Sequence, residues 1–156
     1  MSKPQHLLVA SDGSPDSLKA AALAGELARA LGAKVTLLAV QSEDDVLPHA
    51  WAAGNYPDET VSDSVPTEDI RKTLKRRVLE VELPHVAEAL GQLPIQAELV
   101  HRWGHPASEI CDYADEQGVD LIVVGSHGRT GIKRVLLGSV SRAVSGSASC
   151  SVVIAR

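Results

Sequence analysis

The sequence VDLIVVGSHGRTGIKRVLLGSVS, residues 119–141, decides the fold class because it places three kinds of segment in one order. Its first six residues form an apolar run that is typical of a buried strand. Glycines at positions 125, 128 and 131 follow, and Gly138 with Ser139 then opens a short helical pattern that runs to about Ala148. Glycine in a loop is entropically costly, so this series indicates a backbone that turns sharply or approaches another group closely. The stretch therefore predicts a strand, a glycine-rich loop and a helix.

The rest of the chain repeats this alternation of strand and helix. Apolar or β-branched runs predict strands at residues 6–10, 34–40, 95–101, 119–124 and 150–155. Helical spacing of apolar residues predicts helices at residues 15–31, from 67 to about 90, 106–117 and 138–148. Ser14 is placed as N-cap with Pro15 in the first turn, and Gly32 is placed to end that helix. We expect Pro84 to kink the second helix.

This alternation predicts an α/β fold, an open doubly wound parallel sheet of five strands in the order 3-2-1-4-5 with helices on both faces. The length of 156 residues and the hydrophobic content of 44% suit a single domain, residues 1–156, and the absence of Phe makes its core aliphatic. Residues 41–66 are rich in proline and acids, and we expect a variable loop there that is either functional or partly disordered.

The winding of such a sheet reverses between its first and fourth strands, and ligands bind at that reversal. The loops after these two strands, residues 11–15 (SDGSP) and 125–131 (GSHGRTG), are the most glycine-rich and polar junctions of the chain. A glycine loop can turn several N–H groups towards one anion, and a helix start at Gly138 would favour a phosphate. Hydroxyl groups and cations that could add to this site are those of Ser139, Ser141, Arg129, Lys133 and Arg134. The alternative is a tight turn with solvent-facing basic residues.

Composition excludes several classes of function. The net charge of −5 and the aromatic content of 3% argue against nucleic acid as a partner. No apolar stretch approaches the roughly 18 residues of a membrane span, and the N-terminal sequence MSKPQHLLVASDG lacks the pattern of a signal peptide. Two cysteines make no disulfide framework. The chain is therefore predicted to be cytoplasmic, without membrane or nucleic-acid partners.

Two local features have plain structural explanations. His101 and His105 could form a metal pair, but no third ligand accompanies them, so we predict no metal site. The basic run at residues 71–77 falls on a predicted helix, and its charges are expected to be a solvated face. The apolar stripe of that helix would consist of Ile70, Leu74, Val78 and Val81.

Two known phosphate motifs are missing. No glycine is followed by Lys-Ser or Lys-Thr as in a P-loop, and the turn after the first strand has one glycine instead of the dinucleotide pattern G-x-G-x-x-G. The spacing G-x2-G-x9-G-S, formed here by Gly125, Gly128, Gly138 and Ser139, resembles the ATP-binding signature of the universal stress protein family. The segments SDGSPDS and GHPASEI are also similar to that family, and the resemblance covers nearly the whole chain.

The resemblance implies an adenine nucleotide α-hydrolase-like fold that binds ATP, with or without Mg²⁺. Ala10, Ser11 and Asp12 would line the nucleoside, with Asp12 near the ribose or a metal-bound water, and the backbone of Val40 would meet adenine. The residues that would border the ribose and phosphates, or hold the phosphates, are Gly125, Ser126, His127, Gly128, Arg129, Gly131, Gly138, Ser139, Val140 and Ser141.

The family also commonly forms homodimers through its last strand, here residues 151–155. Ser151 stands where the family usually has proline, which adds an N–H group to this edge. The function implied is a nucleotide-dependent switch in the stress response, with no assigned catalytic residue. Two alternatives stay open: a slow ATPase, for which His127 and Asp12 are the only nearby candidates, and a dimeric interaction module that binds AMP or a cyclic nucleotide.

Overall fold

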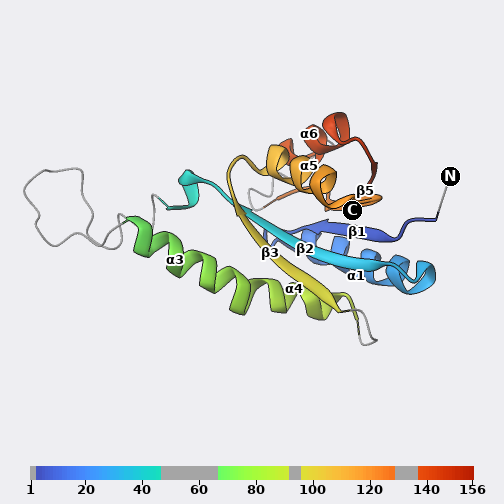
Figure 1. The fold of residues 1–156 in the computed structure, drawn as a ribbon, viewed down its shortest axis with the longest axis horizontal. Helices are drawn as coiled ribbons and strands as arrows, with labels where there is room; N and C mark the ends of the chain where they lie inside the picture. The colour runs from blue at the N-terminus through green and yellow to red at the C-terminus, as the bar shows by residue number, and fades with distance from the viewer. Residues whose placement is uncertain (1–2, 47–66, 92–95, 129–136) are drawn as a thin grey trace, which may run out of the picture.

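The computed structural model describes residues 3–46, 67–91, 96–128 and 137–156. Its centre is a five-stranded parallel sheet in the order β3-β2-β1-β4-β5, with helices on both faces (Figure 1). The predicted fold class and strand order are confirmed. The strands are β1 (His6–Ala10), β2 (Lys34–Gln41), β3 (Ala97–Trp103), β4 (Leu121–Gly125) and β5 (Ser151–Ala155). The sequence placed β3 two residues too early at each end.

Each face of the sheet has its own aliphatic core. On one face, α1 (Pro15–Leu31) and α4 (Leu83–Ala89) cover residues such as Leu7 and Leu37. On the other, α5 (Pro106–Gln117) and α6 (Ser139–Ser147) cover residues such as Ile122. Burial of large aliphatic side chains on both faces explains why the strands read as nearly continuous apolar runs.

Local signals set the limits of α1. The Ser14 side chain accepts a hydrogen bond from the Ser17 N–H group, and Pro15 occupies the first turn, as the sequence predicts. Gly32 ends the helix in the left-handed conformation with φ 63°. Because these residues begin and end the helix, its N-terminus lies immediately beyond β1, where the candidate site is built.

The helix predicted from residue 67 to about residue 90 is continuous through Pro84, and it includes a π-helical turn. It consists of α3 (Thr67–Arg77), the π turn (Val78–Glu82) and α4. The N–H group of Leu83 donates to the carbonyl of Val78, five residues earlier. A π turn relieves the clash and the missing donor of a helical proline, so the helix continues through Pro84 with a change of helical register, while the kink stays a prediction.

That change of register corrects the predicted apolar stripe. Ile70, Leu74 and Val78 are buried as expected, but Val81 is 61% exposed. Leu83, five residues after Val78, is buried in its place. The five-residue step of a π turn accounts for the shift.

Several predicted features lie wholly or partly outside the described residues. Residues 47–66 of the predicted variable loop are among them, while Gln41 belongs to β2. No helix in the described ranges is long and apolar enough to cross a membrane. A single domain over 1–156 stays a prediction.

Candidate functional site

The two loops expected at the reversal of the sheet do meet. Ala10 at the end of β1 pairs with Val124 of β4, so the segments that follow leave the sheet side by side. The Ser14 hydroxyl donates to the carbonyl of His127 over 3.4 Å. The two loops are therefore joined directly at the carboxyl ends of β1 and β4.

The turn between β1 and α1 is held by its own serines and by Asp12. The Ser11 hydroxyl donates to that of Ser17 over 3.0 Å, and the Ser17 hydroxyl donates to the carbonyl of Ser14 over 2.8 Å. Asp12 Oδ1 accepts from the Ser14 N–H group at 3.0 Å, and Gly13 has φ 77°. These bonds leave Asp12 half-buried at the rim of the turn.

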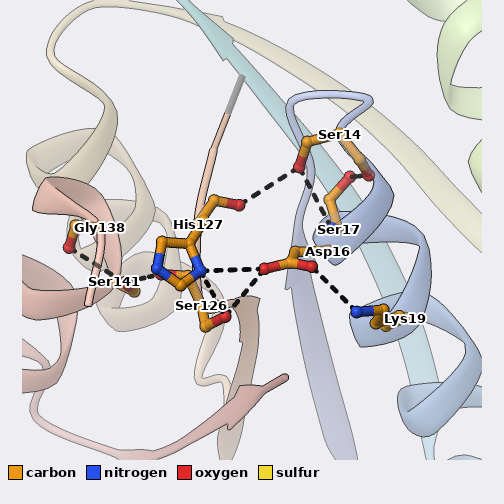
Figure 2. A network of polar contacts seen from close by, with 8 residues as sticks. All are labelled: Ser14, Asp16, Ser17, Lys19, Ser126, His127, Gly138 and Ser141. Carbon is orange, nitrogen blue, oxygen red and sulfur yellow. Dashed lines mark hydrogen bonds and ion pairs between the residues drawn. The ribbon is translucent and has the colours of Figure 1, made fainter. Parts of the chain in front are cut away.

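The first two residues of the loop after β4, Ser126 and His127, form a polar cluster with Asp16 of α1, which Figure 2 shows from close by. The Ser126 hydroxyl donates to Asp16 Oδ2 over 2.8 Å and lies 2.9 Å from His127 Nδ1. His127 Nδ1 is 3.3 Å from the same carboxylate oxygen, and Lys19 Nζ is 3.2 Å from Asp16 Oδ1. Mainly through the hydrogen bond from Ser126, the pKa of Asp16 is lowered to about 2, so this side chain is a carboxylate at neutral pH.

Sequence reasoning missed Asp16. An acidic residue in the first turn of a helix is explained by the helix dipole alone, so nothing local marked it as part of the site. Its two partners, Ser126 and His127, are 110 and 111 residues away along the chain. The parallel pairing of β1 with β4 is the feature that brings them together.

Three glycines of the signature allow close approach of the two loops and α6. A Cβ on Gly125 would lie 2.7 Å from the carbonyl carbon of Asp16. On Gly128 it would lie 2.8 Å from Asp12 Oδ2, and on Gly138 it would lie 3.2 Å from the Ser126 carbonyl oxygen. The spacing of these glycines is therefore explained by packing within the protein, whether or not a ligand also requires it.

The N-terminus of α6 completes the candidate site. The Gly138 N–H group donates to the carbonyl of Ser126 over 2.8 Å. The Ser141 hydroxyl donates to the carbonyls of Gly138 and Ser126, over 3.0 and 3.2 Å. N–H groups in the first turn of a helix have no partner within it, so those of residues 139–141 are available to an anion by their position in the helix.

The other predicted site residues fall into three groups. Ala10 and Val40 lie near the carboxyl ends of β1 and β2 and pack against the core under α5 and α6. Ser139 is exposed and Val140 is half-buried in the first turn of α6. Arg129 and Gly131 lie outside the described residues.

The two histidines considered as a metal pair, His101 and His105, lie elsewhere, and the basic run at residues 71–77 lies on α3. The Nε2 atom of His101 is 2.9 Å from the side-chain oxygen of Gln41, and its ring meets Trp103 edge-on at 4.9 Å. His105 precedes α5 and is exposed. Within the part of the chain that the structure describes, no group of three or more His, Cys, Asp or Glu residues could hold a metal ion.

Comparison with known proteins gives one consistent family. The model of the universal stress protein family matches residues 4–156. Universal stress protein YxiE of Bacillus subtilis is 39% identical over 150 residues, covering 96% of this chain and 97% of that protein. The structure of MJ0577, a universal stress protein of Methanocaldococcus jannaschii, has a TM-score of 0.78 at 21% identity and covers 99% and 96% of the two chains. A universal stress protein in complex with cAMP has a TM-score of 0.64 at 27% identity, covering 99% and 98%. The chain belongs to the universal stress protein family.

Proposed function

We propose that this protein binds ATP in the crevice between β1 and β4 and acts as a nucleotide-dependent switch in the stress response. The observation that carries the proposal is the contact between Gly138 and Ser126, which puts the start of α6 against the loop after β4. Both segments offer backbone N–H groups at the reversal of a doubly wound sheet, where such folds bind nucleotides. The cAMP complex of a family member with 27% identity supports an adenine nucleotide as the ligand class.

In this proposal the phosphates lie at the first turn of α6, with the hydroxyl of Ser139 as a further donor. Ser141 contributes its backbone N–H group, because its hydroxyl already donates to the carbonyls of Gly138 and Ser126. Asp12 lies on the ribose side, and Ala10, Ser11 and Val40 line the nucleoside. Mg²⁺ would enter with the triphosphate and offset part of its charge. The remaining residues assigned to the ribose and phosphates are those of the glycine loop: Gly125, Ser126, His127, Gly128, Arg129 and Gly131.

The number of phosphates separates ATP from the alternative ligands. The family signature favours a polyphosphate, whereas the cAMP complex shows that a relative accepts a cyclic monophosphate. Calorimetric titration of the nucleotide-stripped protein with ATP, AMP and cAMP, with and without Mg²⁺, compares them directly. We expect saturable binding of ATP near one site per chain, with weaker binding of AMP and cAMP. Tighter binding of AMP or cAMP would favour the interaction module instead.

A glycine substitution tests the site itself. Gly128→Val is expected to abolish ATP binding while the fold is retained, because its Cβ would enter the phosphate approach. Among the described residues this Cβ would meet only the end of the Asp12 side chain, at 2.8 Å. Gly146→Ala is the matched control, since a Cβ there has nothing within 4 Å among the described residues. Unchanged ATP affinity in Gly128→Val would refute the proposed site.

The switch is proposed to act as a homodimer in the cytoplasm. β5 is an outer strand of the described sheet and pairs there with β4 alone, and its Val152, Val153 and Ile154 are half-buried. An open edge of this kind can pair with the same strand of a second chain. Light scattering during gel filtration should give twice the chain mass, and a mass of one chain would contradict the dimer.

Slow hydrolysis of ATP is the second candidate, and one contact favours it. A histidine that acts as a base needs a group to orient it, and Asp16 Oδ2 lies 3.3 Å from His127 Nδ1. A single-turnover assay of Asp12→Ala and His127→Ala separates the two candidates. If the wild-type protein hydrolyses ATP and both variants lose this turnover, the protein is an ATPase. If the wild type binds ATP without turnover, it is a switch.

A further inference from the structure

Arg142 brings a positive charge to the start of α6, where the phosphates of the nucleotide are proposed to lie. It is the fourth residue of that helix, and its side chain turns back along the helix axis. Arg142 Nη2 donates to the carbonyl of Leu137 over 3.3 Å, and Leu137 directly precedes the N-cap, Gly138. Side chains of an α-helix lean towards its N-terminus, which is why Arg142 reaches this end. The guanidinium group therefore lies beside the first turn of α6.

The start of α6 is positive from two sources. The N-terminus of a helix carries a partial positive charge, so an anion is favourable there and a cation is unfavourable. α1 and α5 follow this rule, because Asp16 and Glu109 lie in their first turns. α6 has no acidic residue in its first turn, and its N-cap is a glycine, which has no side chain to accept from the N–H groups. Arg142 adds a full charge to this end, and a bound anion would relieve the repulsion.

The order of the strands decides which part of a nucleotide comes near Arg142. The residues proposed to line the nucleoside belong to β1, β2 and the turn after β1, whereas α6 packs against β5, and β4 and β5 lie on the other side of β1 from β2. The phosphates therefore extend from the β1 side towards α6. Ser141 and Val144 are buried and Arg142 is exposed, so Arg142 lies on the solvent side of the helix. A monophosphate ends near the ribose, and only a longer phosphate chain reaches this side.

We infer that Arg142 is a specificity-determining residue of the nucleotide site and makes it prefer a polyphosphate to a monophosphate by binding the terminal phosphates. The inference rests on the proposed function for the presence of the nucleotide, and on the contact with Leu137 for the position of the charge. A guanidinium group has five N–H groups in a planar fork that matches phosphate oxygens. The bond to Leu137 uses one of them and holds the fork at the start of the helix.

Two carboxylates near the crevice make a cation necessary there. Asp12 lies at the rim of the turn after β1, and Asp16 lies beside Ser126 at the start of the loop after β4. Lys19 pairs with Asp16 over 3.2 Å and offsets part of that charge. The remaining repulsion grows with the number of phosphates, because each added phosphate adds negative charge. Arg142 offsets it at the end of the site where the added phosphates lie.

Calorimetric titration of the wild type and Arg142→Gln with ATP and with AMP tests the inference. Glutamine removes the charge but keeps a polar side chain with good helix propensity at an exposed position, so the fold should be retained. We expect the affinity for ATP to fall about five- to thirtyfold in Arg142→Gln and the affinity for AMP to change less than about twofold. Arg142→Lys keeps the charge without the fork, so its affinity for ATP should lie between those of the wild type and Arg142→Gln.

Arg76→Gln is the matched control. Arg76 is exposed on α3, which lies on the opposite side of the sheet from α6 (Figure 1), and its replacement changes the net charge by the same amount. We expect ATP to bind this variant as it binds the wild type. Salt gives a second measurement, because it screens interactions between exposed charges. From about 50 to about 500 mM salt, the preference for ATP over AMP should shrink in the wild type and change less in Arg142→Gln.

Each contrary result has its own meaning. Equal affinity of the wild type and Arg142→Gln for ATP would overturn the role of Arg142 and leave the proposed function standing. Equal losses of affinity for ATP and AMP would overturn the preference for terminal phosphates. A loss of the same size in Arg76→Gln would show that net charge, and not the position of Arg142, is responsible. Absence of ATP binding to the wild type would overturn the proposed function and this inference together.

Discussion

Gly25 lies where α1 crosses the end of α4, and replacing it with alanine tests how closely the two helices must pack. A Cβ at this position would lie 2.1 Å from the carbonyl oxygen of Leu90 and 2.8 Å from its carbonyl carbon. Contacts of a Cβ below 3.0 Å require a shift, so the backbone near Leu90 would have to move by 0.9 Å, the difference between 3.0 and 2.1 Å. The obstacle is backbone, which cannot rotate away as a side chain can.

The cost follows from three terms. Overpacking a well-packed contact costs about 1–3 kcal/mol, and a backbone obstacle favours the upper end. Movement of Leu90 also weakens its hydrogen bond from Arg29 Nη1, now 3.0 Å long, by about 0.5–1.5 kcal/mol. Alanine recovers about 1 kcal/mol through its higher helix propensity. The net expectation for Gly25→Ala is a loss of about 2–3 kcal/mol.

Urea denaturation followed by circular dichroism measures this loss, with unchanged m-values as the check on two-state unfolding. In a domain of this size the expected fall in Tm is roughly 4–12 °C. Gly146→Ala is the control, since a Cβ there meets nothing within 4 Å among the described residues and should stabilise by at most about 1 kcal/mol. Equal stability of Gly25→Ala and the wild type would show that the helices are not held at the distance described here.

Three further predictions concern acid stability and helical register. The folded-state pKa of Asp16 is about 2 against an ordinary 3.8, so its stabilising effect is present above pH 3.8 and lost as the pH falls towards 2. In urea titrations, the free energy of unfolding of Asp16→Asn should therefore fall less than that of the wild type over this pH range. Burial, aided by Lys34, lowers the pKa of His6 below 6.5, so the free energy of unfolding should fall as the pH drops from 6.5 through that lowered value. A dependence of stability on pH that is as steep in His6→Gln as in the wild type would contradict this. Leu83→Ala should cost about 2–5 kcal/mol and Val81→Ala less than about 0.5 kcal/mol in the same denaturation assay; comparable losses would argue against the π turn.

The predictions that succeeded from sequence rest on short-range physics. Apolar runs predicted the strands, and the cap at Ser14 and the left-handed end at Gly32 follow from residues a few positions away. The strand order followed because alternating strands and helices with right-handed crossovers leave few topologies. The meeting of the loops after β1 and β4 then followed from the fold rule for doubly wound sheets.

Other features depend on tertiary contacts. The register change at Pro84, which exposes Val81 and buries Leu83, is decided by which side chains the sheet can cover. The reason for a glycine at 125 is a peptide group in α1, more than a hundred residues earlier in the chain.

The sequence by itself determined the sheet, the boundaries of α1 and the place where the loops after β1 and β4 meet, because each follows from local preference or from a general rule of the fold. Only the tertiary structure decided which side chains share that place. Asp16 was assigned to the site by its contacts with Ser126 and His127. Hydrogen-bond roles depend on distances of about 3 Å between atoms that the chain separates widely, and no local pattern contains that information.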